Sequence, residues 1–247
     1  MDRLLYVAMN GASRALQAQG KVSHNLANAN TPGFKAALNQ TEATNVDGPG
    51  WQSRVHASAA EGGYDALPGA VKTTGRSLDI ALQPGTWLAV EAADGSTAYT
   101  RAGNLQIDVN GRLQTASGNA VLGGGGAIGV PPAESISIGR DGTFSIIPLG
   151  VGGGVNAEID RIRVVQEPDA GMLRGTDGLF RPRDTEQELA PAGDDAILSG
   201  ALEQSNVNPA SALVSMIEQQ RRFETQIQLM KKADEHAQRT AELLRMR

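Results

Sequence analysis

Histidine and acidic side chains are the residues of this sequence best suited to bind metals or transfer protons. The histidines His24, His56 and His236 are far apart in the 247-residue chain, and none has a histidine partner at the spacing that places two metal ligands on one helix face. Asp79 and Asp108 have the chemistry of a glycosidase carboxylate pair, but nothing in the sequence brings them together. We therefore expect no catalytic residue, no metal site and no cofactor site.

Two glycine clusters have the spacing of phosphate-binding loops. Gly124, Gly126 and Gly129 match the pattern G-x-G-x-x-G, and residues 152–157 match a looser form of it. A dinucleotide site requires a helix to begin at such a loop, whereas the first cluster is followed by two prolines and the second by a strand-like segment. We interpret both clusters as flexible surface loops.

Composition excludes several classes of protein. The net charge is −5, from 22 basic and 27 acidic side chains, which disfavours a sequence-independent nucleic-acid binder. The absence of cysteine excludes disulfides and thiolate metal sites. The apolar stretch at residues 4–9 is too short for a membrane span or a secretory signal. We therefore expect no nucleic-acid partner, no membrane insertion and no cleavable signal peptide.

Glycine and proline are distributed unevenly. Residues 1–31 hold two of the 30 glycines and no proline, and residues 199–247 hold one of each, so the other 27 glycines and 10 of the 11 prolines fall in residues 32–198. Because both residue types disfavour helix interiors, the ends and the middle are expected to fold differently.

Apolar residues at both ends recur every three or four positions, the period of a helix. The first helix is predicted from Arg3 to Asn28, and Pro32 and Gly33 follow it as stop signals. The second is predicted to begin after Asn208, a favoured N-cap residue, with Pro209 at its first position. It would run for about 36 residues, on the order of 54 Å.

A helix of this length has to pack on another long helix, so we expect the two termini to pair as a coiled coil. The alternative is that both helices pack on the middle domain. Because the stripes are narrow and rich in alanine, an isolated pair would be marginal, and the helices are expected to be loosely structured in the free monomer. The predicted subunit interface, with intrachain packing as the alternative role of each residue, comprises Leu4, Leu5, Leu16, Val22, Leu26, Leu213, Ile217, Phe223, Ile227, Met230 and Leu244.

The middle of the chain alternates between apolar and polar residues, as half-buried strands do. This pattern predicts regular strands mainly over residues 71–166, for example at Leu105, Ile107 and Val109 and at Phe144 and Ile146. Asp-Gly or Asn-Gly pairs at positions 94, 110 and 141 are the pairs that two-residue hairpin turns require. The middle is therefore predicted to be an antiparallel β domain.

Several segments resemble those of flagellar rod and hook proteins. NLANANTPGFK at residues 25–35 is similar to the N-terminal signature of that family, and GALEQSNVN at residues 200–208, with QRRF at 220–223, is similar to its C-terminal signature. Between them, SLDIAL, WLAV and YTRAGN at residues 77–82, 87–90 and 99–104 resemble the shared β domain. The chain is thereby identified as a member of the flagellar basal-body rod family.

The opening residues 1–12 and the sequence PGTWL at residues 84–88, where distal rod and hook subunits carry G-x-G-F-F, favour the proximal rod. The resemblance implies an α+β fold, with a discontinuous coiled-coil domain of residues 1–35 and 200–247 and an inserted β domain of residues 36–199. It implies a structural protein that polymerises helically into the drive shaft connecting motor to distal rod and hook. The implied location is the periplasmic part of the basal body, reached through the flagellar type III export apparatus.

The implied partners are other copies of the chain, other proximal rod subunits and the distal rod protein. The signature loop containing Asn25, Asn28, Thr31, Gly33 and Phe34 is interpreted as a hinge between the domains, or alternatively as an ordinary helix stop. Other interpretations remain open at this stage: a distal rod subunit, a non-flagellar surface-binding module, and a carbohydrate-active enzyme.

Overall fold

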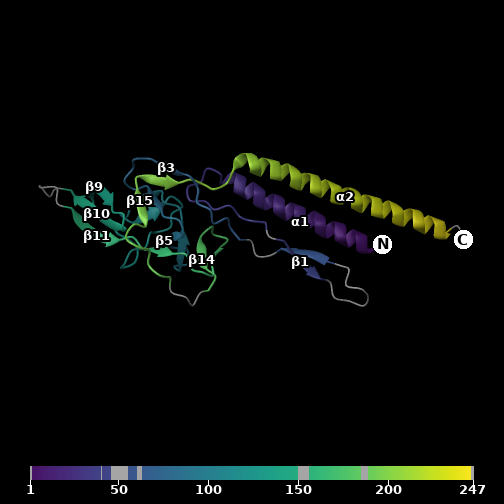
Figure 1. Ribbon diagram of the computed structural model, residues 1–247, viewed down its shortest axis with the longest axis horizontal. Coiled ribbons are helices and arrows are strands. Elements are labelled where there is room, and N and C mark those ends of the chain that lie inside the picture. Colours follow the sequence, from purple (N-terminus) through teal and green to yellow (C-terminus); the bar gives the residue numbers. More distant parts are fainter. Residues whose placement is uncertain are drawn as a thin grey trace. The chain divides into compact units, whose positions relative to one another are not determined.

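The computed structural model describes residues 2–39, 41–45, 55–59, 63–149, 156–184 and 189–245, and it forms two compact units (Figure 1). The helical unit contains Met1–Ala29, Ala36–Tyr64 and Val207–Arg247; the β unit contains Asn30–Lys35 and Asp65–Asn206. These limits differ from the domain boundaries expected from the sequence. Residues 30–35 and 200–206 group with the strands, and residues 36–64 group with the helices.

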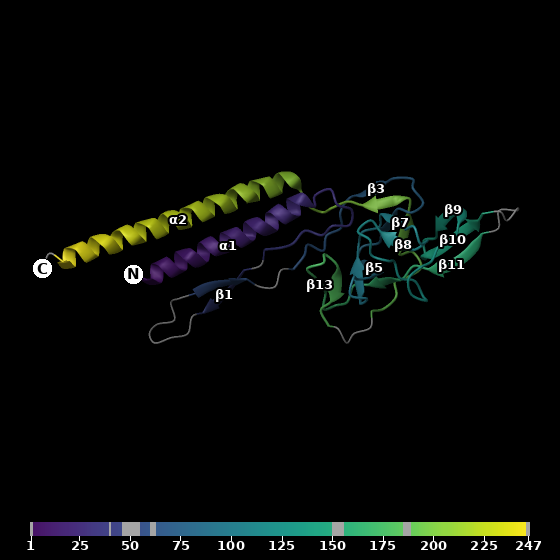
Figure 2. The ribbon, with the colours of Figure 1, turned by 180° about the vertical axis from the view of Figure 1, so that it is seen from behind.

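The two predicted helices are confirmed. Helix α1 spans Asp2–Ala27 and helix α2 spans Pro209–Arg245. They lie side by side and run in opposite directions, so that both chain ends lie at the same end of the pair (Figures 1 and 2). The side-chain oxygen of Asn208 accepts hydrogen bonds from the amides of Ala210 and Ser211, at 3.0 and 3.2 Å, which satisfies two of the unpaired donors at the start of α2.

The helical unit also contains a strand pair that the sequence pattern did not predict. Strands β1 (Thr41–Asn45) and β2 (Val55–Ala59) are antiparallel, and Ala37 forms an isolated bridge with Tyr64. The side-chain amide of Asn25 donates to the carbonyl of Ala37 and accepts from its amide, both at 2.9 Å. This side chain therefore holds the returning chain against the last turns of α1.

The described strands of the β unit pair only in antiparallel fashion, as predicted. A five-stranded sheet has the order β12-β5-β6-β14-β13, a three-stranded sheet has the order β11-β10-β9, and three further pairs are β15-β4, β16-β3 and β7-β8. The strands are β3 (Val71–Thr73), β4 (Ile80–Leu82), β5 (Thr86–Glu91), β6 (Thr97–Thr100), β7 (Leu105–Ile107), β8 (Leu113–Thr115), β9 (Ala133–Ile138), β10 (Thr143–Pro148), β11 (Ala157–Arg161), β12 (Val164–Gln166), β13 (Met172–Arg174), β14 (Phe180–Pro182), β15 (Ile197–Ser199) and β16 (Ala201–Glu203). Four of them lie beyond residue 166, outside the segment where strands were mainly expected.

A single cluster of buried apolar side chains forms the core of the β unit. Phe144, Ile146 and Leu105 are almost fully buried, as their alternating positions predicted. The same pattern was wrong for Val109, which is fully exposed because strand β7 ends at Ile107 and Val109 belongs to the following turn.

The Asp-Gly and Asn-Gly pairs lie in turns, as expected, but the prediction that these turns have two residues was wrong. The connection from β5 to β6 spans residues 92–96, and that from β7 to β8 spans residues 108–112. In the described residues only glycines have positive φ, whereas the two-residue Asn-Gly turn requires it at both positions. Instead, an aspartate carboxylate accepts the amide two residues later, as Asp94 does from Ser96 at 2.9 Å.

Candidate assembly site

Small residues form the contact between α1 and α2. Among the described side chains of α1, those of Ala8, Ala12, Ala15 and Val22 are buried, and Ala8, Ala15 and Val22 follow one another at intervals of seven residues. On α2, Ala212 and Ala233 are buried, and a Cβ built on Gly11 would meet the side-chain end of Gln226. Because alanine buries little apolar area, this seam stabilises the pair only weakly.

The larger apolar residues of the predicted interface occupy three different environments. Leu5, Leu16, Leu213 and Ile217 are 38 %, 51 %, 50 % and 54 % exposed, so packing within this chain does not cover them. Val22 is buried in the seam. The remaining described members are half-buried, namely Leu26, Phe223, Ile227 and Met230, and the side chains of Leu4 and Leu244 lie outside the described residues.

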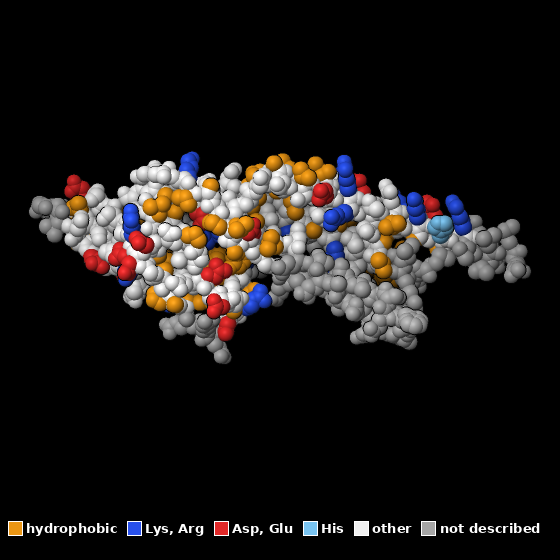
Figure 3. All heavy atoms as spheres, viewed as in Figure 1, with side chains coloured by type: hydrophobic (Ala, Val, Ile, Leu, Met, Phe, Trp, Pro, Cys, Tyr) orange, Lys and Arg blue, Asp and Glu red, His pale blue; other side chains and the backbone are white. Residues whose placement is uncertain are grey.

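Other exposed apolar residues extend the uncovered surface beyond the predicted set. Tyr6, Val7 and Met9 on α1 are 61 %, 57 % and 49 % exposed, and Val214 on α2 is 58 % exposed. Figure 3 shows apolar side chains gathered at the surface over the first turns of α2. The predicted interface was chosen from apolar residues spaced three or four positions apart, which lie on a single stripe of each helix. This rule therefore missed exposed apolar residues beside the stripe, such as Val7 and Val214.

The five residues of the signature loop are divided between the two units. Asn25 and Asn28 belong to the helical unit, where the side-chain amide of Asn28 donates to the carbonyl of His24 at 2.9 Å near the end of α1. Thr31, Gly33 and Phe34 belong to the β unit. The boundary between the units therefore falls inside the loop, after Ala29, and the hinge role stays a prediction.

Gly33 and Phe34 are buried in the β unit. The φ of Gly33 is +69°, a value that disfavours other residues, and a Cβ there would overlap the carbonyl oxygen of Arg101. The ring of Phe34 lies 4.5 Å from the guanidinium of Arg174, which also lies 5.8 Å from the ring of Phe180. Burial of Arg174 lowers its pKa. These contacts fix the second half of the loop on the strands.

A buried group of charges lies beside this loop, and the sequence reasoning missed it. Glu203 at the end of β16 accepts from Lys35 Nζ at 3.0 Å and from Arg101 Nε at 2.7 Å, and all three side chains are about 3 % exposed. Burial lowers the pKa of Lys35, while the hydrogen bond from Lys35 to Glu203 acts in the opposite direction. We call Lys35, Arg101 and Glu203 the Glu203 cluster. Each of the three residues lies in a segment that resembles the flagellar rod family. Because these segments are far apart in the sequence, their contact could not be predicted from it.

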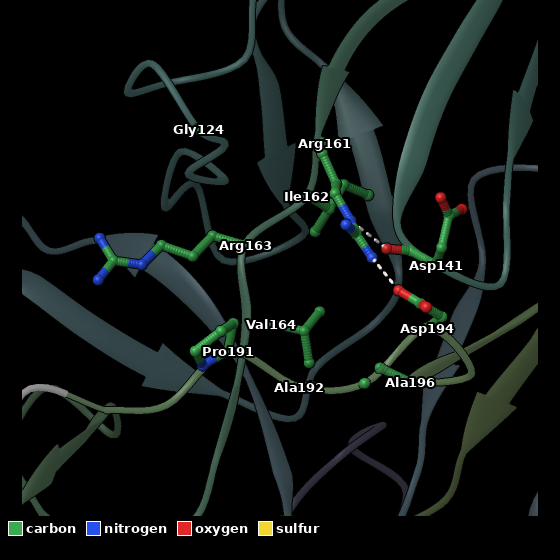
Figure 4. Close-up of a pocket in the computed structure, with 11 residues that line it drawn as sticks. Gly124, Asp141, Arg161, Ile162, Arg163, Val164, Pro191, Ala192, Asp194 and Ala196 are labelled. Carbon is green, nitrogen blue, oxygen red and sulfur yellow. Dashed lines mark hydrogen bonds and ion pairs between the residues drawn. The ribbon is translucent and has the colours of Figure 1, made fainter.

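A surface cavity of about 380 Å³ in the β unit is lined by charged side chains, among them Asp141, Arg161 and Asp194 (Figure 4). Arg161 donates to the carbonyl of Asp141 at 2.6 Å and pairs with the carboxylate of Asp194 at 3.0 Å, so both contacts serve to join turns. Hydrogen bonds from Thr143 lower the pKa of Asp141, whereas a general acid needs a raised pKa. Asp141 is therefore suited to holding a turn and not to donating a proton.

The other sequence candidates for chemistry also have structural contacts. Asp79 is buried and accepts from Arg76 at 3.2 Å, and hydrogen bonds from the amides of Arg112 and Asn110 lower the pKa of Asp108. The amide of Gly124 donates to the carboxylate of Asp160 at 3.0 Å, which places negative charge where a phosphate would bind. The second glycine cluster, residues 152–157, lies largely outside the described residues.

The described residues hold neither a metal-binding cluster nor a membrane-spanning helix. They contain no group of three or more acidic or histidine side chains that could hold a metal ion. Neither helix, within its described residues, combines the length and apolar character that crossing a membrane requires.

Three family models match separate parts of the chain. Residues 5–35 match the model described as flagella basal body rod protein, and residues 81–146 match the flagellar hook protein FlgE/F/G D1 domain. Residues 198–243 match the flagellar basal body rod FlgEFG protein C-terminal model. The matches at the two ends cover most of α1 and α2 and both signature segments.

Full-length relatives are also found. The chain is 41 % identical over 251 residues to the flagellar basal-body rod protein FlgF of Salmonella typhimurium and to that of Escherichia coli, covering 100 % of each chain. It is 31 % identical over 268 residues to the flagellar basal-body rod protein FlgG of Bacillus subtilis, covering 99 % of this chain and 100 % of the relative.

Proposed function

This chain belongs to the flagellar basal-body rod protein family, and we infer from that membership how its surfaces act in the rod. It is a structural subunit of the proximal rod, the role that full-length identity to FlgF supports. The single observation that carries our proposal for assembly is the set of large apolar side chains left exposed on α1 and α2, including Leu16, Leu213 and Ile217.

We propose that neighbouring subunits cover these side chains. A contact between unlike surfaces of identical or related chains builds a helical filament when the rotation that it imposes does not close into a ring. The partners would be other copies of this chain, other proximal rod subunits and the distal rod protein. Fully burying one large apolar side chain contributes about 1.5–3 kcal/mol, and these side chains are about half buried already. Each contact would therefore add roughly half of that, and several contacts together would stabilise the subunit in the shaft.

We further propose that α1 and α2 act as an antiparallel coiled coil in the assembled rod. The seven-residue spacing of Ala8, Ala15 and Val22 supports this, because a coiled coil buries positions that repeat at this interval. The small side chains of the seam support the expectation that the pair is loosely structured in the free monomer. Such a state would suit passage through the type III export apparatus to the periplasmic part of the basal body.

A non-enzymatic role is part of the same proposal. Support comes from the cavity beside Arg161, where the lowered pKa of Asp141 is opposite to what a carbohydrate-cleaving acid requires. A surface-binding module would have no need for exposed apolar helices, so truncation of α2 would then leave its binding intact.

The test is complementation of a bacterium that lacks its own proximal rod subunit. The wild-type chain should restore rods and swimming, and a Leu213→Ala/Ile217→Ala variant should restore far fewer rods at equal protein level. Glu218→Ala, an exposed polar change on the same helix, is the control and should behave as wild type. Imaging of the basal body should locate the chain at the proximal rod; density at the distal rod would favour the alternative.

A further inference from the structure

The Glu203 cluster joins segments that are far apart in the sequence. Lys35 follows α1, Arg101 follows β6, and Glu203 precedes α2, with 168 positions between Lys35 and Glu203. The carboxylate of Glu203 also accepts the amide of Gly69 at 3.0 Å. Removing the negative charge would deprive two buried cations of the carboxylate that they share and leave them backbone carbonyls such as those of Leu67 and Thr86, an arrangement that folded proteins tolerate poorly.

Backbone hydrogen bonds bring the same two segments together. The amide of Gly33 donates to the carbonyl of Glu203 at 2.8 Å, and the amide of Asn206 donates to the carbonyl of Phe34 at 3.3 Å. The segment leaving α1 and the segment entering α2 are thus bonded to each other within the β unit.

We propose that Glu203 is a positioning residue that links these two segments and thereby favours the pairing of α1 with α2. Eight residues separate Ala27 from Lys35 and six separate Glu203 from Pro209, so about 14 residues lie between the helix ends and the link. If the first segment were released completely, including the contacts of Gly33 and Phe34, it would be free back to Asp65, where the β unit resumes, and the length would become about 44 residues. Loop closure scales as the −3/2 power of length, so pairing would become about fivefold less favourable.

The chain offers a direct measurement because it contains no cysteine. Gly11 on α1 faces the end of the Gln226 side chain on α2, so Gly11→Cys/Gln226→Cys introduces two thiols across the seam. Equilibration of the purified full-length chain with glutathione gives the effective concentration of one thiol at the other. Glu203→Gln in this background should lower that effective concentration by twofold or more, up to the limit of about fivefold for complete release of the segment.

Two companion variants make the result decisive. Glu134→Gln is the same substitution at an exposed position on β9 and should leave the effective concentration unchanged. If Glu203→Gln does not fold, Lys35→Met is the deciding variant, because it keeps the pair of Arg101 with Glu203. It removes the hydrogen bonds of Lys35 to Glu203 and to the carbonyls of Ala66 and Leu67. It should lower the effective concentration by twofold or more and speed amide exchange at Gly33. An unchanged effective concentration in the folded variants would overturn the proposal.

The biological role of the Glu203 link rests on the proposed function in rod assembly. The thiol experiment does not depend on that function. The thiol experiment uses the isolated chain, so it can fail while complementation succeeds. Conversely, failure of the wild-type chain to join rods would overturn the proposed function and leave the thiol result standing.

Discussion

The two units of this protein bury different kinds of side chain. In the β unit, Trp87, Phe144 and Leu88 are almost fully buried, and a group of buried charges is satisfied internally. In the helical unit, the buried residues are mostly alanines, while Leu16 and Ile217 remain about half exposed. Since apolar burial is the main favourable contribution to folding, the β unit has the means to be stable alone and the helix pair lacks them.

The contrast shows that one chain combines a well-packed β unit with helices whose large apolar side chains remain exposed. The β unit also contains the parts of both family signatures that lie nearest the helices, at residues 30–35 and 200–206. The unit with the larger apolar core therefore holds the segments that lead to the helices, whose exposed apolar side chains we propose are covered in assembly.

The largest expected effect is in the β core. Phe144→Ala removes a fully buried ring from β10 and should lower the free energy of unfolding by about 3–5 kcal/mol. Thermal unfolding should show a midpoint lower by about 10 °C. Leu16→Ala, at a half-exposed position of α1, is the matched control and should change the midpoint little. Equal losses in the two variants would mean that the helical unit is as tightly packed as the β unit.

A smaller loss is expected at the unit boundary. Gly33→Val combines an unfavourable positive φ with overlap of the Arg101 carbonyl oxygen, and should cost about 1–3 kcal/mol or more. Gly75→Val is the control, because Gly75 has a φ of +75° but an open surrounding. Chemical denaturation compares the two free energies. A Gly33→Val chain with wild-type stability and motility would contradict both the observed contacts and the hinge interpretation.

Acid should weaken the β unit through its turns. Hydrogen bonds to the carboxylates of Asp94, Asp108, Asp141 and Asp177 lower each pKa from the usual 3.8. A lowered pKa in the folded state contributes stability above pH 3.8, and that stability is lost as the pH falls through the lower value. The midpoint of β-unit unfolding, followed by Trp fluorescence, should therefore fall below about pH 4. Asp141→Asn should make the loss of stability at low pH smaller. An unaltered pH profile in this variant would show that protonation of Asp141 does not contribute to that loss.

The smallest effect on the monomer is expected on the assembly surface. Ile217→Ala removes an exposed side chain and should change the stability of the purified chain by less than about 0.5 kcal/mol. Hydrogen exchange should also show weak protection of α1 and α2 in the dilute chain. Rod assembly should nevertheless decrease, and a large loss of monomer stability would show that Ile217 packs within its own chain.

Local features of the fold were predictable from sequence. The first helix was expected from Arg3 to Asn28 and spans Asp2–Ala27, and the Asn208 cap was identified because it depends on a few adjacent residues. The short strands β13 to β16 were not identified, since three-residue strands show too little alternation and are held by distant partners. The prediction of two-residue turns was wrong because Asp carboxylates stabilise longer loops, in which the residue before the glycine does not have positive φ.

The sequence by itself determined the helices, the antiparallel β middle and the family, since periodicity and signature segments are local properties. Only the tertiary structure decided which apolar residues are covered. Val22 and Leu16 belong to the same predicted stripe, yet one is buried and the other exposed. It also brought Lys35, Arg101 and Glu203 together, because contacts across 168 positions depend on how the intervening chain folds.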